Sequence, residues 1–300
     1  MYTEIASNKR KSIILIGVFL VLVIGLGWLI SLYYGDQTIL SIAVAIAVGQ
    51  ALASYYWADS IALGISGATE APRKEPFVAL HRAVENLAIT AGLPKPRVYV
   101  IDDPAPNAFA TGRDPKHAAI AVTTGLLQKL DKTELEGVIA HELSHIGNYD
   151  IRVMTIVVVL VGVISLVADF FLRSLWWGGS DRDRNGGGNQ LMLIAVIVAA
   201  ILAPIAATLI QLAVSRKREY LADATGALLT RYPDGLAKAL EKIATTPHTV
   251  KHLSSSTNHL YIENPLSEQE EQQNWFATIF STHPPVADRI KRLKAMIGKA

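Results

Sequence analysis

His141-Glu142-Leu143-Ser144-His145 is the stretch from which the organisation of this chain can be worked out. On a helix, histidines spaced i and i+4 lie about 40° apart around the axis and one turn apart along it, so both imidazoles can reach a single metal ion. The glutamate lies within about 100° of the first histidine and can accept a proton from a water that the metal activates. The stretch therefore predicts a helix that supplies His141 and His145 as metal ligands and Glu142 as general base.

The residues upstream predict the helix that carries this motif. Apolar residues at helical spacing form a stripe on one face, namely Leu135, Val138 and Ile139. Two capping boxes are available for the helix start, Asp131 with Glu134 and Thr133 with Glu136. The helix is expected to run to about Ile146 and to end at Gly147. The alternative, in which both histidines are ordinary core residues, requires partners for two buried imidazoles and a carboxylate, which a metal supplies most simply.

A catalytic zinc site needs a third protein ligand and an open position for water. The sequence has no cysteine, which excludes a disulfide framework, a thiolate metal site and a cysteine nucleophile, so the third ligand must be His, Asp or Glu. Glu219 and Asp223 lie one turn apart on one face of an expected helix. Taken alone this spacing is more typical of a solvated helix face. Together with the motif at 141–145, it makes Glu219 the predicted third ligand.

The N-terminal part of the chain, residues 1–59, predicts a membrane hairpin. Residues 13–32 and 38–57 are uncharged runs, each about 30 Å long as a helix and thus long enough to cross a bilayer core. Basic residues 9–11 precede the first run, whereas the connecting loop carries only Asp36. By the positive-inside rule, the N-terminus and everything after the second run face the cytoplasm. A cleaved signal peptide is the competing interpretation, but its apolar region is shorter and no small-x-small cleavage site follows the first run.

A second apolar block, residues 151–214, separates the histidine motif from Glu219. Its two apolar runs, 151–172 and 191–214, are each long enough to span a membrane. Buried core helices are the alternative, because Asp169 lies inside the first run and Pro204 inside the second.

The position of Glu219 constrains this second block. If its carboxylate joins the two histidines at one metal, the chain must cross the membrane an even number of times between them. Two apolar runs satisfy this requirement, and the basic segment 215–218 again suits a cytoplasmic exit.

Residues 60–150 and 215–300 have the composition of the two parts of one folded soluble domain. A helix is expected over residues 76–91, and strands rich in β-branched residues over 97–101 and 118–123. Residues 107–112 look turn-like, with one buried aromatic. The predicted fold class is α+β and mostly helical, with transmembrane helical hairpins at 1–59 and 151–214.

Composition agrees with this organisation. A 300-residue chain that is 51% hydrophobic has enough apolar material for one soluble domain and several membrane spans together. Its mean hydropathy of +0.30 is too high for an ordinary soluble enzyme. The net charge is only +2 and the basic residues are spread along the chain, so nucleic acid is not expected as a partner.

The chain resembles the HtpX-type membrane metalloproteases, which are related to the prenyl-protein (CAAX) proteases. The resemblance covers nearly the whole chain and is carried by an ordered set of motifs: the N-terminal hairpin, residues 107–112, 123–127, 141–145, Ser215-Arg216-x-x-Glu219-Tyr220-x-Ala222-Asp223, 259–265, and 281–285 with Arg289. It implies a gluzincin-like catalytic domain in which one zinc ion is held by His141, His145 and Glu219. It also implies that Glu142 is the base.

Other roles follow from the resemblance with less support from the residues. Asp223 is similar to the carboxylate that orients a ligand imidazole, here that of His141. His283 is a candidate stabiliser of the transition state, with a plain loop residue as the alternative. Tyr220 is a second candidate, but a role in holding the helices together is favoured for it. The segment Asn107-Ala108-Phe109-Ala110 resembles an edge strand that pairs with extended substrate.

The resemblance implies proteolysis of misfolded or damaged membrane proteins in cellular quality control. It also implies a multi-pass protein of the plasma (inner) membrane, with the lipid bilayer as partner and the catalytic domain facing the cytoplasm. One rival is a prenyl-protein protease acting on lipidated C-termini, which the short chain with two N-terminal spans disfavours. Another is a non-catalytic zinc-binding scaffold, in which a base beside the metal would serve no purpose.

Overall fold

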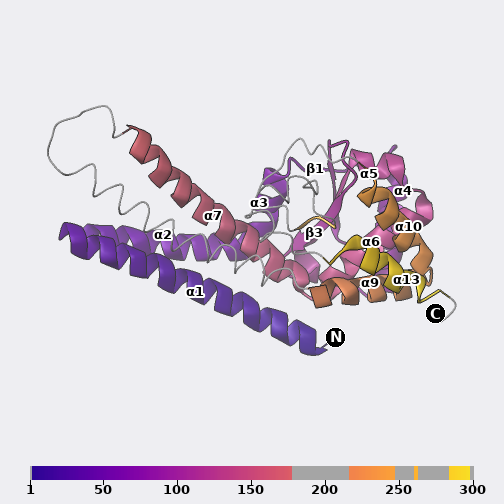
Figure 1. Cartoon of the computed structure of the whole chain (residues 1–300), viewed down its shortest axis with the longest axis horizontal. Coiled ribbons are helices and arrows are strands. Elements are labelled where there is room, and N and C mark those ends of the chain that lie inside the picture. Colours follow the sequence, from indigo (N-terminus) through magenta and orange to yellow (C-terminus); the bar gives the residue numbers. More distant parts are fainter. Residues whose placement is uncertain (1, 178–215, 247–259, 263–283, 298–300) are drawn as a thin grey trace.

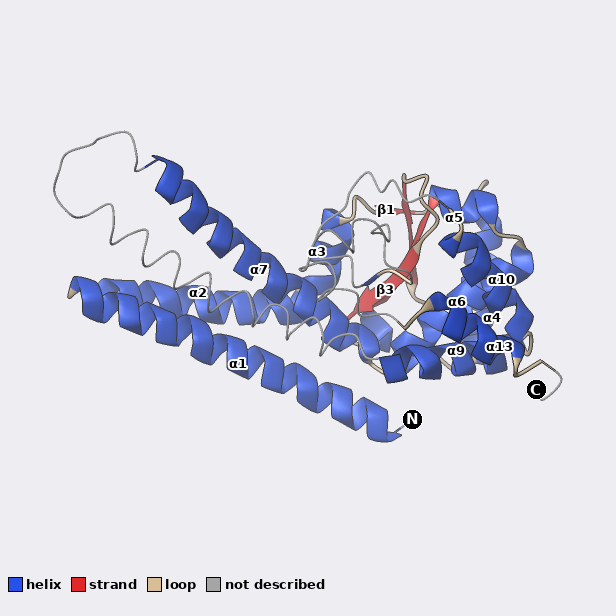
Figure 2. Ribbon diagram, viewed as in Figure 1, coloured by secondary structure: helices blue, strands red, loops and turns tan. Residues whose placement is uncertain are grey.

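The computed structural model describes residues 2–177, 216–246, 260–262 and 284–297. In these ranges the chain is mostly helical with one small sheet, as the sequence predicts. Figures 1 and 2 show two parts: an arm, made of α1 and α2, and a body that holds the sheet and the shorter helices. The elements are α1 (Tyr2–Tyr34), α2 (Gln37–Tyr56), α3 (Ala58–Ile65), β1 (Thr69–Glu70), α4 (Val78–Thr90), β2 (Arg97–Ile101), β3 (Ala108–Gly112), β4 (Ala118–Thr123), α5 (Thr124–Lys129), α6 (Lys132–Gly147), α7 (Asp150–Trp177), α9 (Arg216–Thr230), α10 (Pro233–Ala244) and α13 (Val286–Lys294).

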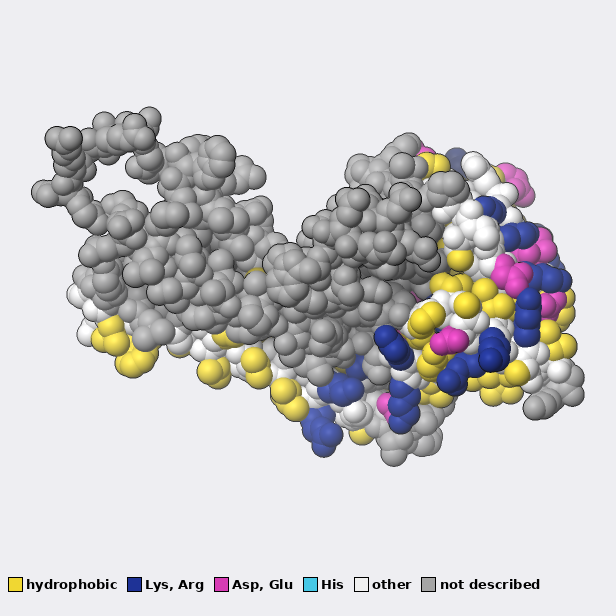
Figure 3. All heavy atoms as spheres, in the orientation of Figure 1, with side chains coloured by type: hydrophobic (Ala, Val, Ile, Leu, Met, Phe, Trp, Pro, Cys, Tyr) yellow, Lys and Arg dark blue, Asp and Glu magenta, His cyan; other side chains and the backbone are white. Residues whose placement is uncertain are grey.

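The arm consists of the two apolar runs at the N-terminus, folded as antiparallel helices that pack along each other. The Asp36 carboxylate between them accepts a hydrogen bond of 2.8 Å from the Thr38 backbone and so caps α2. Large apolar side chains such as Ile13 and Ile46 point outward with more than half of their surface exposed. Figure 3 shows such side chains along the arm, whereas Lys and Arg side chains lie over the body and its junction with the arm.

Helix α2 is, among the described residues, the one helix long and apolar enough by itself to cross a bilayer. Helices α6 and α7 pass the same test only as a pair, and they are bent by 84° at the break between them. The predicted run at 151–172 lies within α7, which leaves the body on the side of the arm (Figure 1). The second predicted run, 191–214, lies outside the described residues.

The sheet has the strand order β1-β2-β4-β3. Strands β2 and β4 pair in parallel and have the bounds that their β-branched residues predict. Residues 108–112, predicted to be turn-like, instead form β3, which pairs antiparallel with β4 at the edge of the sheet. The turn prediction was wrong because the strand depends on β4, a partner that lies in a different segment. An edge strand at residues 107–110, which the resemblance implies, agrees with the position of β3, while its pairing with substrate stays a prediction. The aromatic Phe109 is buried as expected, with its ring centroid 5.4 Å from that of Tyr261.

Helix α6 runs through the middle of the body. Its start is fixed by the capping box of Asp131 and Glu134, in which each side chain accepts from the other residue's backbone N–H, at 2.9 and 2.8 Å. Four apolar residues of α6 are fully buried in a core that also includes residues of α4, β4 and α10: Val138, Ile139, Leu143 and Ile146. Burial of side chains of this size contributes about 1.5–3 kcal/mol each. The predicted motif therefore lies on one of the most firmly held elements of the body.

Helix α9 packs closely against α6 because Gly226 has no side chain. A Cβ at this position would lie 3.1 Å from the backbone nitrogen of His141, closer than carbon atoms normally approach. Gly137 of α6 has the same function toward α10, since its Cβ would lie 2.7 Å from the Leu236 nitrogen. These contacts bring the first turn of α9, with Glu219, over the histidines of α6.

Candidate metal centre

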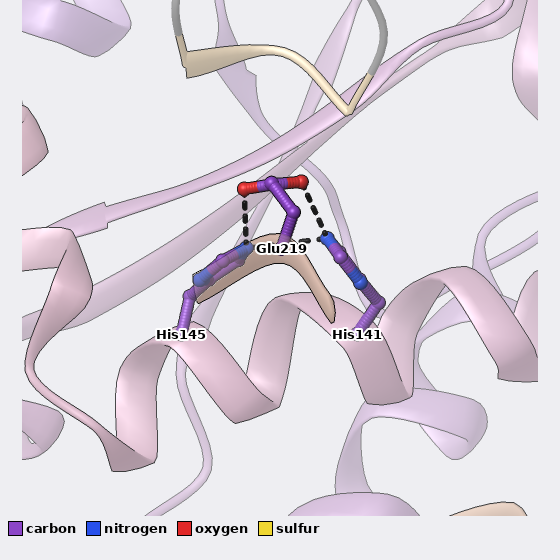
Figure 4. Close-up of side chains that lie close together, drawn as sticks. All are labelled: His141, His145 and Glu219. Atoms are coloured by element: carbon purple, nitrogen blue, oxygen red, sulfur yellow. Dashed lines mark hydrogen bonds and ion pairs between the residues drawn. The ribbon is translucent and has the colours of Figure 1, made fainter. Parts of the chain in front are cut away.

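Three buried side chains converge above α6 (Figure 4). His141 and His145 rise from the same side of α6, and Glu219 reaches across from α9. The two Nε2 atoms lie 3.2 Å apart. The Glu219 carboxylate lies 3.7 Å from Nε2 of His141 through Oε2, and 3.5 Å from Nε2 of His145 through Oε1. The structure thus brings together the three residues that the sequence singled out as ligands.

The separations between these atoms fit a tetrahedral metal site. Zinc binds imidazole nitrogen and carboxylate oxygen at about 2.0–2.2 Å, so two ligand atoms of a tetrahedral site lie about 3.4 Å apart. The three measured separations of 3.2, 3.5 and 3.7 Å lie around that value. Three protein ligands leave a fourth position for water or a carbonyl oxygen, which is the arrangement of a catalytic site.

The charges around the site also call for a cation. Four carboxylates are buried there, those of Glu142, Asp150, Glu219 and Asp223, and two arginines, Arg218 and Arg289, are buried with them. Carboxylates therefore outnumber guanidinium groups among these buried side chains. Buried charge of this kind is costly unless it is paired. A divalent cation between the imidazoles and Glu219 would balance it.

His141 is oriented by a carboxylate on α9. Asp223 Oδ1 lies 3.0 Å from Nδ1 of His141, so Nδ1 carries the proton and Nε2 presents its lone pair toward Glu219. Burial alone would raise the pKa of Asp223, but the charge and hydrogen bonds of Arg289 and His141 outweigh burial and lower the pKa to about 2. Arg289 also donates a 2.9 Å hydrogen bond to the carbonyl of Ile262. Arg289 therefore holds the elements around the site together.

His145 has a corresponding partner that the sequence analysis missed. Asp150 Oδ2, at the start of α7, lies 3.1 Å from Nδ1 of His145. Burial lowers the pKa of His145, but the hydrogen bond with Asp150 and the surrounding carboxylates outweigh it and raise the pKa to about 9. The available signal was an acidic residue directly after the motif, at the boundary with the apolar run.

Glu142 lies on α6 between the two histidines and is buried. Removal from water raises the pKa of its carboxyl group, and the nearby imidazoles and a hydrogen bond from the Ala110 backbone N–H only partly oppose this. A carboxylate with a raised pKa is better suited to take up a proton near neutral pH than an exposed one.

Strand β3 lies beside Glu142, and its outer edge has partners within the chain. The Ala110 N–H donates to Glu142, and the Ala108 carbonyl accepts a 3.0 Å hydrogen bond from the Ile262 N–H. Asn107 is buried at the start of the strand, where its backbone N–H donates to the Thr123 hydroxyl at 2.9 Å.

Of the two candidate stabilisers of the transition state, the structure describes Tyr220. The Tyr220 ring stacks under the Arg292 guanidinium, 3.9 Å from the ring centroid, and so links α9 to α13. His283 lies outside the described residues.

Comparison with known proteins identifies the family. The profile of Peptidase family M48 matches residues 74–297. The chain is 49% identical to "Protease HtpX homolog" of Tropheryma whipplei, over 99% of this chain and 98% of that protein. It is 46% identical to the protein of the same name from Caldanaerobacter subterraneus, with 99% and 98% covered, and 41% identical to that from Listeria monocytogenes, with 99% and 100% covered.

Among solved structures, the crystal structure of S. mikatae Ste24p is similar with a TM-score of 0.49 and 20% identity, over 98% of this chain and 67% of that one. The family profile and the curated relatives each cover most of the chain. This chain therefore belongs to peptidase family M48, with HtpX-type proteases as its relatives, and is a metalloprotease.

Proposed function

We propose that the chain is a membrane-bound, zinc-dependent endopeptidase whose ligands are His141, His145 and Glu219. The observation that carries this proposal is the convergence of two imidazoles from α6 and one carboxylate from α9 at tetrahedral separations (Figure 4). Two nitrogens and one oxygen, without a thiolate, form a ligand set that zinc uses in metalloproteases.

Zinc bound there would polarise the scissile carbonyl and lower the pKa of the attacking water. Glu142 accepts the proton of that water and later delivers it to the leaving amine. Asp223 and Asp150 keep the two imidazoles in the tautomer that leaves both Nε2 atoms available to the metal. No side-chain nucleophile takes part, so no covalent acyl-enzyme forms.

Strand β3 supports a mode of substrate recognition. An extended peptide beside residues 107–110 would place its backbone next to Glu142 and the metal ligands, and edge pairing reads backbone rather than side chains. The Ala108 carbonyl is bonded to Ile262, so a peptide that pairs there must displace this bond. Recognition through the backbone suits misfolded or damaged membrane proteins, which we propose as substrates in quality control.

The arm and α7 support membrane insertion with the body in the cytoplasm. In this proposal residues 1–59 form one hairpin and 151–214 a second, while 60–150 and 215–300 form the protease domain. The basic residues 9–11 at the inner end of α1 and the outward-facing apolar residues of the arm support this orientation in the plasma (inner) membrane.

Cleavage by the full chain in detergent tests the enzymatic proposal. The protein is stripped of metal, reloaded with zinc and given an unfolded protein as substrate, beside Glu142→Gln and Glu136→Gln forms. Glu136 is the matched control, because it lies on the same helix, half-buried, and pairs with the exposed Lys132 at 3.9 Å. We expect Glu142→Gln to cleave the substrate at least about 100-fold more slowly than wild type, and Glu136→Gln to cleave it at the wild-type rate. Equal cleavage by wild type and Glu142→Gln would remove the proposed base.

The same assay separates the rival functions. Selective cleavage of a prenylated C-terminal peptide over the unfolded protein would indicate a prenyl-protein protease. Zinc binding without any cleavage by the wild-type chain would indicate a scaffold.

A further inference from the structure

A buried side chain of the arm contacts the residues beside the candidate metal centre. Asn8 of α1 is completely buried, and its Nδ2 donates to Asp150 Oδ1 at 2.7 Å and to the Asn148 carbonyl at 2.9 Å. These residues are 142 and 140 positions away in the sequence. This buried carboxamide lies five residues before the first apolar run, and its hydrogen-bond partners lie in the body.

Asn8 binds both sides of the corner between α6 and α7. Asn148 is the C-terminal cap of α6, Asp150 is the first residue of α7, and the two helices meet at 84°. Tyr149 between them has a φ of 60°, which a residue with a side chain seldom adopts. The Lys9 ammonium lies 4.6 Å from the centroid of the Tyr149 ring. Two consecutive residues of α1 thus hold a corner that the local backbone does not favour by itself.

The corner matters because Asp150 is the partner of His145. One oxygen of its carboxylate, Oδ2, faces Nδ1 of His145, while the other, Oδ1, accepts from Asn8. Arg218 Nε also lies 3.5 Å from Oδ1, too far for a strong hydrogen bond. Without the Asn8 donor, the carboxylate is free to turn toward Arg218, and the imidazole loses a fixed acceptor.

We propose that Asn8 is a positioning residue of the metal centre, which makes the geometry of His145 depend on the docking of the N-terminal helix. The inference rests on the proposed metal site. It adds a link from α1 through Asp150 to a ligand, so that the membrane helix and the metal site are coupled. Mutation of a residue that hydrogen-bonds to a metal ligand typically changes metal affinity about 10–100-fold. Asn8 contacts such a residue and not the ligand itself, so its mutation should have a smaller effect, about 2–10-fold.

Zinc affinity of the purified full chain, measured by competition with a chromogenic chelator, tests the proposal without reference to activity. The variants are Asn8→Ala, the isosteric Asn8→Asp, and Ser12→Ala as control. Ser12 is also buried on α1, but within the described part of the chain its hydroxyl donates to the Asn8 carbonyl of its own helix and to no residue of the body. We expect about 2–10-fold weaker zinc binding for Asn8→Ala and a larger loss for Asn8→Asp, which sets a carboxylate against Asp150. Ser12→Ala should bind zinc like wild type.

A double-mutant cycle separates positioning from simple packing. If Asn8 acts through Asp150, then Asn8→Ala should have no effect on zinc affinity in an Asp150→Asn background. A purely structural role would instead lower the unfolding temperatures of the metal-free and zinc-loaded chains equally and leave zinc affinity unchanged, which would overturn the inference. So would an equal effect of Asn8→Ala in both backgrounds. Failure of the wild-type chain to bind zinc would be a different result, because it would refute the proposed function itself.

Discussion

Arg289 donates two hydrogen bonds to the Asp223 carboxylate, 2.9 Å from Nε to Oδ2 and 2.7 Å from Nη2 to Oδ1. The pair is buried, and Asp223 also faces the imidazole of His141. His141, the first of the two proposed metal ligands on α6, is therefore held by a network that joins α9 and α13. Because the carboxylate at its centre must be ionised, the network should respond to acid.

Acid should remove the contribution of Asp223 to stability. Its pKa is about 2 in the folded chain instead of 3.8, which corresponds to about 2 kcal/mol that is present above pH 4 and is lost as the pH falls toward 2. Asp223→Asn should therefore lower the unfolding temperature of the metal-free chain at pH 7, and the difference from wild type should shrink between pH 4 and 2.

The control for this prediction is Asp234→Asn, which breaks an exposed pair with Lys238. Such surface pairs contribute little, so this variant should resemble wild type throughout. A difference between wild type and Asp223→Asn that stays constant down to pH 2 would contradict the assignment.

Zinc binding should release a proton from His145. In the metal-free chain the pKa of His145 is raised to about 9, so the protonated imidazole stabilises the fold below about pH 6.5, and this contribution is lost as the pH rises through 9. A metal ligand must be unprotonated, so zinc affinity should increase with pH up to about 9. Calorimetric titrations at pH 7.5 in buffers of different ionisation enthalpy should show proton release. Identical binding enthalpies in all buffers would contradict this prediction.

A methyl group added at Gly226 should disturb the close packing of α9 against α6. Gly226→Ala places a Cβ against the His141 backbone, which should cost about 1–3 kcal/mol of stability and weaken zinc binding by moving Glu219 away. Gly147→Ala is the matched control, because its Cβ would lie 3.6 Å from a Leu93 side chain, an ordinary contact. Comparison of unfolding temperatures and zinc affinities tests this. Equal behaviour of the two variants would show that the helix contact is not tight.

The absence of cysteine makes the membrane orientation directly testable. Single-cysteine forms carry Gln37→Cys, at the start of α2 beside the turn of the arm, or Lys132→Cys, at the start of α6 in the body. A membrane-impermeant thiol reagent added to intact cells should label the Gln37→Cys form alone, and the Lys132→Cys form only after cell rupture. Labelling of Lys132→Cys in intact cells would place the body outside the cytoplasm.

Features governed by local sequence could be predicted from the chain alone. The capping box of Asp131 and Glu134 starts α6 and depends only on two residues three positions apart. The β-branched residues of β2 and β4 give those strands their predicted bounds. The residues of β3 by themselves indicate a turn, because alanine, phenylalanine, threonine and glycine become a strand here only through pairing with β4. The edge strand at residues 107–110 was expected only from the family resemblance.

The candidate metal centre likewise combines features set by local sequence with features set by contacts between distant residues. The 141–145 motif predicts which side of α6 carries the imidazoles, because helix geometry fixes that relation. Asp150 and Asn8 were missed since their roles arise from a corner between two helices and from a contact over 142 positions. In the sequence, Asn8 is simply a polar residue before a basic segment.

The zinc K-edge X-ray absorption spectrum of the zinc-loaded full chain, compared with that of a Glu219→Ala form, tests the central claim most directly. If two imidazoles from α6 and one carboxylate from α9 surround the metal, the wild-type spectrum should show the scattering of two imidazole ligands. All nearest neighbours should be oxygen or nitrogen at about 2.0–2.1 Å. The zinc site of Glu219→Ala should keep both imidazole ligands. It should lose one oxygen neighbour, or hold a water there at a different distance. A wild-type spectrum with fewer than two imidazoles, or an identical spectrum for the two forms, would contradict the account.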